Sequence, residues 1–87
     1  MKAKSLSAQL KKASSASAQT VADQLMALRA ERGLSQARLA ELAGVDRKTI
    51  NRIENGHFSP SLDTITRLSV VLKCRITDLL EKSKTRR

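Results

Sequence analysis

The stretch Gln36–Asn55, QARLAELAGVDRKTINRIEN, decides how this chain folds. The fifth residue of the stretch is Ala40, which is small enough for a second helix to cross close over it. The ninth is Gly44, where a tight turn requires a positive φ that glycine adopts without steric cost. Apolar residues occupy the inner positions on both sides of this glycine: Leu39, Ala43, Val45, Ile50 and Ile53. We therefore predict two short helices that cross at a glycine turn.

Capping residues and glycines predict the bounds of this second helix and of the helix before it. Thr20 and Asp23 fit a capping box for a first helix, which ends at Gly33. Ser35 caps the second helix, which ends at Gly44. The residues of the second helix that we expect to face inward are Leu39, Leu42 and Ala43.

Three further helices complete a predicted all-α domain. Asp46 caps the third helix, which ends at Gly56, and Ser61 caps the fourth. The fourth helix has an apolar stripe at helical spacing, formed by Leu62, Ile65, Leu68 and Leu72. A short fifth helix covers Ile76–Glu81. Because the chain has a single aromatic residue and no strand-like alternation, we expect five helices packed around an aliphatic core.

The charge of the chain is strongly basic and unevenly placed. The 87 residues include 17 Lys and Arg against 8 Asp and Glu, a net charge of +9. Residues 1–20 hold four lysines and no acidic residue, and residues 81–87 hold four basic residues and one acidic residue. Such a chain favours a polyanionic partner, either nucleic acid or an acidic membrane surface.

Several other classes of protein are excluded by composition. One cysteine and one distant histidine allow neither an internal disulfide nor a Cys/His metal cluster. No apolar run is long enough to span a membrane. There is also no paired-carboxylate, Cys/His or glycine-rich phosphate motif, so we expect no enzyme activity, no cofactor and no small-molecule ligand.

The two ends of the chain differ in composition from its centre. Residues 1–19 are rich in Ser, Ala, Lys and Gln, and we interpret them as a flexible or partly helical basic extension. Leu6 and Leu10 have the i, i+4 spacing of a short helix. The predicted five-helix domain then covers residues 20–81, and residues 82–87 form a basic tail.

The predicted third helix turns polar and basic side chains outward. These are Arg47, Lys48, Asn51 and Arg52. Arginine and lysine suit the O6 and N7 acceptors of guanine in the major groove, and asparagine suits adenine. A charged helix face is more often simply solvated, so its place beside the glycine turn is what favours DNA contact.

A larger set of residues carries a family resemblance. It comprises Leu28-Arg29, Gly33-Leu34-Ser35-Gln36, Leu39-Ala40, Ala43-Gly44-Val45, Thr49-Ile50, Ile53-Glu54-Asn55-Gly56, Pro60-Ser61-Leu62 and Leu79-Leu80. With these residues the segment from about Val21 to Leu80 resembles the Cro/C1-type, XRE or lambda-repressor-like helix-turn-helix DNA-binding family. The resemblance implies a five-helix fold with its helix-turn-helix unit at residues 36–55, whose second helix enters the major groove.

The resemblance also assigns roles to individual residues. Base contacts are implied for Arg47, Lys48, Asn51 and Arg52. Gln36 resembles a residue that holds a backbone phosphate and bridges to the third helix. Other phosphate contacts are expected from Thr49, Asn55, His57, Ser59 and Ser61, which position the protein without discriminating sequence. Arg29 and Glu54 resemble a partly buried ion pair that fixes the pitch of the third helix.

The function that the resemblance implies is sequence-specific regulation of transcription. The protein is expected in the cytoplasm, associated with the nucleoid, and to be encoded by a bacterium, a phage or a plasmid. We expect a repressor that binds a pseudo-palindromic site on double-stranded DNA as a homodimer. The alternative is an antitoxin that represses its own operon while its basic extension holds a toxin protein. The extension could equally be an arm that wraps DNA.

Three positions depart from the family pattern. Lys73 lies at a helix end where glycine or asparagine is usual, so this turn is expected to be strained. Arg75 replaces the usual cap of the fifth helix, which Thr77 would cap instead, shortening that helix. Cys74 is expected to act as a small buried apolar residue.

Overall fold

Five helices and no strands make up the part of the chain that the structure describes. This computed structural model describes the backbone of residues 3–82 and the side chains of residues 17–82. The helices are α1 (Ala3–Glu31), α2 (Gln36–Ala43), α3 (Arg47–Glu54), α4 (Leu62–Leu72) and α5 (Ile76–Leu80). The predicted all-α, five-helix fold is thereby confirmed. Within the described residues, none of these helices is both long and apolar enough to cross a membrane.

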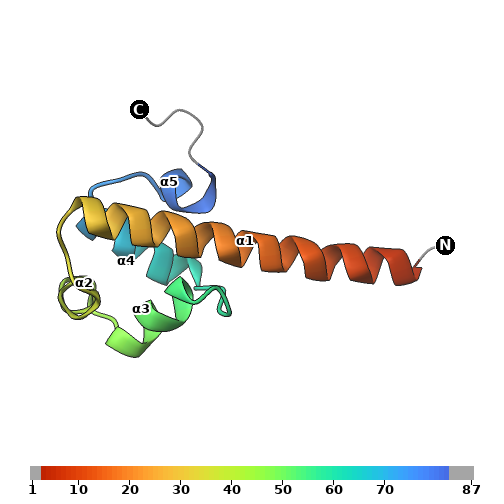
Figure 1. Ribbon diagram of the computed structural model, residues 1–87, viewed down its shortest axis with the longest axis horizontal. Helices are drawn as coiled ribbons and strands as arrows, with labels where there is room; N and C mark the ends of the chain where they lie inside the picture. Colours follow the sequence, from red (N-terminus) through yellow and green to blue (C-terminus); the bar gives the residue numbers. More distant parts are fainter. Residues whose placement is uncertain (1–2, 83–87) are drawn as a thin grey trace.

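The long helix α1 organises the arrangement of the other four. It contacts α3 on one side and α5 on the other, and α4 contacts both α2 and α5 (Figure 1). The largest fully buried side chains come from all five helices: Leu25, Leu39, Ile50, Ile53, Leu68, Leu72 and Leu79. Burying one such side chain stabilises a fold by roughly 1.5–3 kcal/mol, so this aliphatic cluster holds the helices together.

The first helix begins much earlier than the sequence predicts. We expected a capping box at Thr20, but α1 begins at Ala3 and both residues of that box lie inside it. The Gln19 amide donates to the Asp23 carboxylate at 2.9 Å, an i, i+4 contact within the helix, and Ala18 is buried. Because Ala, Lys and Gln are good helix formers, nothing upstream of Thr20 ends the helix. Its first turns extend past the rest of the molecule (Figure 1).

Two of the predicted serine caps are present. The Ser35 hydroxyl oxygen accepts from the backbone N–H of Arg38 at 3.0 Å. The Ser61 hydroxyl oxygen accepts from the backbone N–H of Thr64 at 3.1 Å. Each bond satisfies a backbone donor that has no partner within its own helix, and contributes about 1 kcal/mol. These caps set the amino ends of α2 and α4.

The turn between α2 and α3 depends on Gly44. Its φ of 71° places it in the left-handed region, as predicted. A Cβ at this position would lie 3.2 Å from Nη1 of Arg67, whose guanidinium donates to the Ala43 carbonyl at 3.3 Å. Asp46 is the residue before α3, but its side chain makes no capping hydrogen bond among the described residues, so only the position of this cap was right.

Two leucines expected in the core are exposed. Leu42 is 47% exposed and Leu62 is 69% exposed. The inner face of α2 is formed by Leu39, Ala40 and Ala43, and Leu42 lies about 100° around the helix from the centre of that stripe. Leu62 is the first residue of α4 and lies beyond the edge of the core.

The carboxyl end of α4 lacks the glycine or asparagine cap that the resemblance leads one to expect, and has Lys73 in that position. Lys73 has a φ of 55°, and among the described residues it is the only non-glycine residue with a positive φ. The Arg32 guanidinium Nε donates to the carbonyl of Leu72 at 2.7 Å, which places a positive charge at the carboxyl end of α4. The predicted strain is thus located at one residue of an otherwise capped helix end.

The amino end of α5 is capped by an acidic residue. The Asp78 carboxylate accepts from the backbone N–H of Arg75 at 2.8 Å, so α5 begins at Ile76 and Thr77 is not its cap. Cys74 is half-buried against the core. Burial, and secondly the charge of Asp78, raise the pKa of this thiol, which therefore stays uncharged near neutral pH and packs as an apolar group.

Replacing Lys73 with glycine should stabilise the domain. A left-handed conformation costs a non-glycine residue about 1–2 kcal/mol, part of which is offset because glycine is more flexible when unfolded. We expect Lys73→Gly to raise the free energy of unfolding by about 0.5–1 kcal/mol and the Tm by several degrees. Thermal denaturation followed by circular dichroism measures this.

Gly44→Ala is the matched control, because it introduces the strain that Lys73→Gly removes. Its Tm should fall. A Lys73→Gly variant that melts below the wild type would contradict this account of the turn.

Candidate nucleic-acid interface

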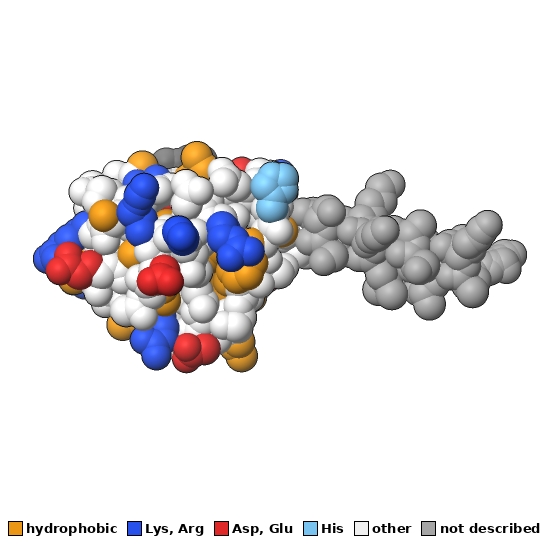
Figure 2. All heavy atoms as spheres, turned by 90° about the horizontal axis from the view of Figure 1, so that it is seen from below, with side chains coloured by type: hydrophobic (Ala, Val, Ile, Leu, Met, Phe, Trp, Pro, Cys, Tyr) orange, Lys and Arg blue, Asp and Glu red, His pale blue; other side chains and the backbone are white. Residues whose placement is uncertain are grey.

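Helix α3 has an apolar inner face and a polar outer face. Ile50 and Ile53 are fully buried against the other helices. The side chains exposed on the helix are those predicted to contact bases: Arg47, Lys48, Asn51 and Arg52. The structure therefore presents all four to solvent, as an interface with DNA requires. Lys and Arg side chains gather across the face of the molecule formed by α2 and α3, with a few acidic ones among them (Figure 2).

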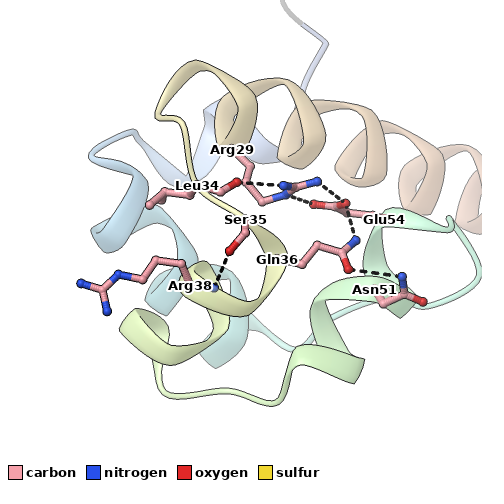
Figure 3. Close-up of polar contacts among 7 residues, drawn as sticks. All are labelled: Arg29, Leu34, Ser35, Gln36, Arg38, Asn51 and Glu54. Carbon is pink, nitrogen blue, oxygen red and sulfur yellow. Dashed lines mark hydrogen bonds and ion pairs between the residues drawn. The ribbon is translucent and has the colours of Figure 1, made fainter.

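An ion pair between α1 and the end of α3 fixes this helix from behind. Nε of Arg29 lies 2.7 Å from Oε2 of Glu54, and its Nη2 donates to Oε1 at 2.9 Å (Figure 3). Its Nη1 donates to the backbone carbonyl of Leu34 at 2.8 Å. The side chain of Arg29 is 20% exposed and that of Glu54 only 5%. The predicted ion pair is present, and it also reaches the segment between α1 and α2.

The charge state of Arg29 is held by this contact. The hydrogen bonds to Glu54 raise the pKa of its guanidinium above the ordinary arginine value, against an opposing effect of burial. Because the folded-state pKa is raised, the charged guanidinium stabilises the fold at every pH below the unfolded-state pKa. This stabilisation is lost only as the pH rises through the folded-state pKa. The arginine side of the pair therefore stays charged throughout the physiological range.

Gln36 joins the ion pair to the outer face of α3. Its Nε2 donates to Oε1 of Glu54 at 2.9 Å, and its Oε1 accepts from Nδ2 of Asn51 at 3.4 Å (Figure 3). Oδ1 of Asn51 in turn accepts from Nδ2 of Asn55 at 3.2 Å. The family resemblance implied a bridge from Gln36 to the third helix, and it did not identify Glu54 as the anchor of that bridge.

The remaining predicted phosphate contacts are spread over two regions. Thr49 is half-buried in the first turn of α3, close in sequence to Arg47 and Lys48. His57 and Ser59 are exposed in the connection between α3 and α4. Ser61 follows at the amino end of α4, where its hydroxyl is engaged in the cap. The structure thus places these candidate contacts in the first turn of α3 and beyond its carboxyl end.

A contact between Arg52 and Phe58 was not predicted. The guanidinium carbon of Arg52 lies 5.1 Å from the centroid of the Phe58 ring, within the range of a cation–π interaction. Phe58 packs against the core and is half-buried. One base-contact candidate is therefore held over a fixed aromatic ring. One sequence signal for this contact was available: Phe58, the only aromatic residue of the chain, follows the basic Arg52 by six positions.

The architecture and these residues match a known family. A profile of the helix-turn-helix family HTH_3 matches residues 25–79. This chain belongs to the HTH_3 helix-turn-helix family. The residues matched include both helices of the predicted helix-turn-helix unit and the ion pair behind it.

Similar proteins support the same assignment. An uncharacterized HTH-type transcriptional regulator of Archaeoglobus fulgidus is 41% identical over 51 residues, which is 59% of this chain and 73% of that protein. The crystal structure of the restriction-modification controller protein C.AhdI from Aeromonas hydrophila has a TM-score of 0.70 and 34% identity, covering 74% of this chain and 97% of that one.

The fold also occurs within longer chains. An HTH_3 family transcriptional regulator from Vibrio cholerae has a TM-score of 0.72 and 30% identity over 76% of this chain, but only 37% of its own length is covered. Apo-HppE has a TM-score of 0.68 and 27% identity over 75% of this chain, with 36% of its length covered. Similarity to this domain therefore does not by itself fix the function of a whole protein.

Breaking the ion pair should destabilise the domain strongly. Arg29→Met leaves the nearly buried Glu54 carboxylate without its partner, which typically costs about 3–5 kcal/mol. Because Arg29 itself is partly exposed, we expect a loss near the lower end of that range. Urea denaturation measures the free energy of unfolding.

Arg38→Met is the matched control. It removes an arginine from the Arg38–Glu41 ion pair, whose two side chains are largely exposed, so the loss should stay within about 0.5 kcal/mol. Equal losses for the two variants would show that the Arg29–Glu54 pair is only a surface contact.

Proposed function

We propose that this protein is a sequence-specific DNA-binding regulator of transcription, acting as a repressor in the cytoplasm. The observation that carries the proposal is the outer face of α3. It exposes three basic side chains and an amide on a helix whose inner face is buried and whose end is held by the Arg29–Glu54 pair. The face is thus both chemically suited to the major groove and fixed in orientation.

Base contacts are assigned to the exposed residues of α3. Arg47, Lys48 and Arg52 suit guanine O6 and N7, and Asn51 suits adenine N6 and N7. Each good bidentate contact discriminates by about 1–3 kcal/mol. The Arg52 guanidinium lies over the ring of Phe58.

Phosphate contacts are assigned to residues around this helix. Thr49 lies in its first turn, Gln36 contacts Asn51 and Glu54 on it, and the remaining residues follow its carboxyl end: Asn55, His57, Ser59 and Ser61. These contacts would set the register of the protein on the duplex. Salt-dependent affinity would come from the basic side chains of α3 and from the basic ends of the chain.

The protein is proposed to act as a homodimer and without enzyme activity. Apolar side chains left exposed on α4 and α5, Val70 and Leu80 among them, supply surface for self-association. Two copies related by a twofold axis would place two α3 helices on half-sites about one helical turn apart. No group of three or more His, Cys, Asp or Glu side chains suited to a metal occurs in the described part of the chain.

Selection of binding sites from random duplex DNA tests this function. We expect two inverted half-sites centred about 10 base pairs apart. Arg52→Ala should lose the preference at one position of each half-site by about tenfold or more, while the other positions keep theirs. Binding that proved independent of DNA sequence would contradict the proposal.

Truncation distinguishes a DNA-binding role of the basic extension from a protein-binding one. The cut should be made before Ser17, because Ala18 is buried and Gln19 contacts Asp23. Log affinity falls linearly with log salt. If the four lysines of residues 1–16 neutralise phosphates, their removal makes this fall less steep, by about 0.9 for each phosphate that is no longer neutralised. An unchanged slope with an unchanged Tm would instead favour a role in binding another protein.

A further inference from the structure

Three side-chain hydrogen bonds link Glu54 to the exposed face of α3, and in all three the donor is the residue farther from Glu54. Asn55 donates to Asn51, Asn51 donates to Gln36, and Gln36 donates to Glu54, at 3.2, 3.4 and 2.9 Å. Every side-chain amide in this relay therefore turns its NH2 group toward the carboxylate. The relay leads from a nearly buried acid to exposed residues of the proposed DNA face.

The carboxylate at one end imposes this direction. A carboxylate accepts hydrogen bonds and donates none, whereas an amide can present either its oxygen or its NH2 group. Because the Glu54 carboxylate can only accept, the group of Gln36 that faces it must be the donor. The oxygen of Gln36 then faces Asn51, which must present its own NH2 group. The orientation of each amide is thus fixed by its neighbour on the side of Glu54.

The direction matters because Asn51 is exposed on the outer face of α3. An amide free to rotate by half a turn exchanges its donor and acceptor and tolerates more than one base edge. Adenine offers an acceptor at N7 beside a donor at N6, while guanine offers two acceptors. An amide of fixed polarity matches one of these patterns in one register only.

We propose that Glu54 determines base specificity from inside the protein, by fixing through Gln36 the donor–acceptor polarity of the Asn51 amide. The Glu54 carboxylate then has a second role besides holding α3 through Arg29: it is the acceptor-only group at which the relay ends. Glu54 acts as a positioning residue and touches no base itself. This inference rests on the proposed function, since it needs Asn51 to contact a base.

Glu54→Gln is the central variant, because it keeps the shape of the side chain but can present either an oxygen or an NH2 group to Gln36. Asn51→Ala first identifies the base pair that Asn51 contacts, as the one position whose preference it abolishes. At that base pair we expect a wild-type preference of about tenfold, falling to threefold or less in Glu54→Gln. Preferences at the other positions should remain.

Arg29→Met is the matched control. It breaks the same ion pair but leaves the carboxylate of Glu54 in place, so it should lower stability and overall affinity while keeping the preference at that base pair. Gln36→Leu cuts the relay without touching the ion pair and should lose the preference as Glu54→Gln does, even if Glu54→Gln fails to fold.

A measurement on the free protein tests the relay independently of DNA. The Gln36 side-chain NH2 signals in an NMR spectrum should exchange slowly with solvent in the wild type and in Arg29→Met, and rapidly in Glu54→Gln. Fast exchange in the wild type would overturn the inference.

The binding experiments have separate outcomes for the two proposals. If the wild type prefers no DNA sequence, the proposed function fails and the specificity role of Glu54 fails with it. If the wild type is specific but Asn51→Ala changes no preference, or Gln36→Leu keeps the preference in full, only this inference is overturned. It is also overturned if Glu54→Gln and Arg29→Met change all positions alike, which would show a purely structural role.

Discussion

The Arg29–Glu54 ion pair is the contact on which the rest of this structure depends. It joins α1 to the carboxyl end of α3 with two short hydrogen bonds, and a third bond from the same guanidinium reaches the chain just before α2. Three elements of the helix-turn-helix region therefore meet at one arginine. The isoleucines of α3 give this helix its burial, but an apolar contact has no preferred direction, and the ion pair supplies one.

The same contact orders the polar surface in front of it. Glu54 accepts from Gln36, and Gln36 accepts from Asn51, so polar groups on the outer face of α3 are tied to the core instead of being freely solvated. Arg52 is held in a different way, over the ring of Phe58. The basic ends of the chain add charge that attracts any DNA, whereas the ordered groups on α3 are those suited to discriminate one sequence from another.

Much of the fold could be predicted from the sequence because it is encoded locally. The cap at Ser35 and the left-handed turn at Gly44 each follow from the chemistry of a single residue. The start of α1 could not be predicted, since a capping pattern at Thr20 competes with a helix-forming segment upstream. The helix runs through Thr20 and begins at Ala3. The exposure of Leu42 and the contact of Gln36 with Glu54 depend on how helices distant in sequence pack together.

The central claim is that the Arg29–Glu54 pair sets the orientation of α3 relative to α1. Residual dipolar couplings of the backbone amides measure that orientation directly, in the wild type and in Arg29→Met under conditions where both are folded. The account predicts that in the variant the couplings of α2 and α3 still fit their wild-type arrangement with each other, while α3 no longer fits its wild-type orientation relative to α1. Couplings from all helices that fit one unchanged arrangement would contradict it.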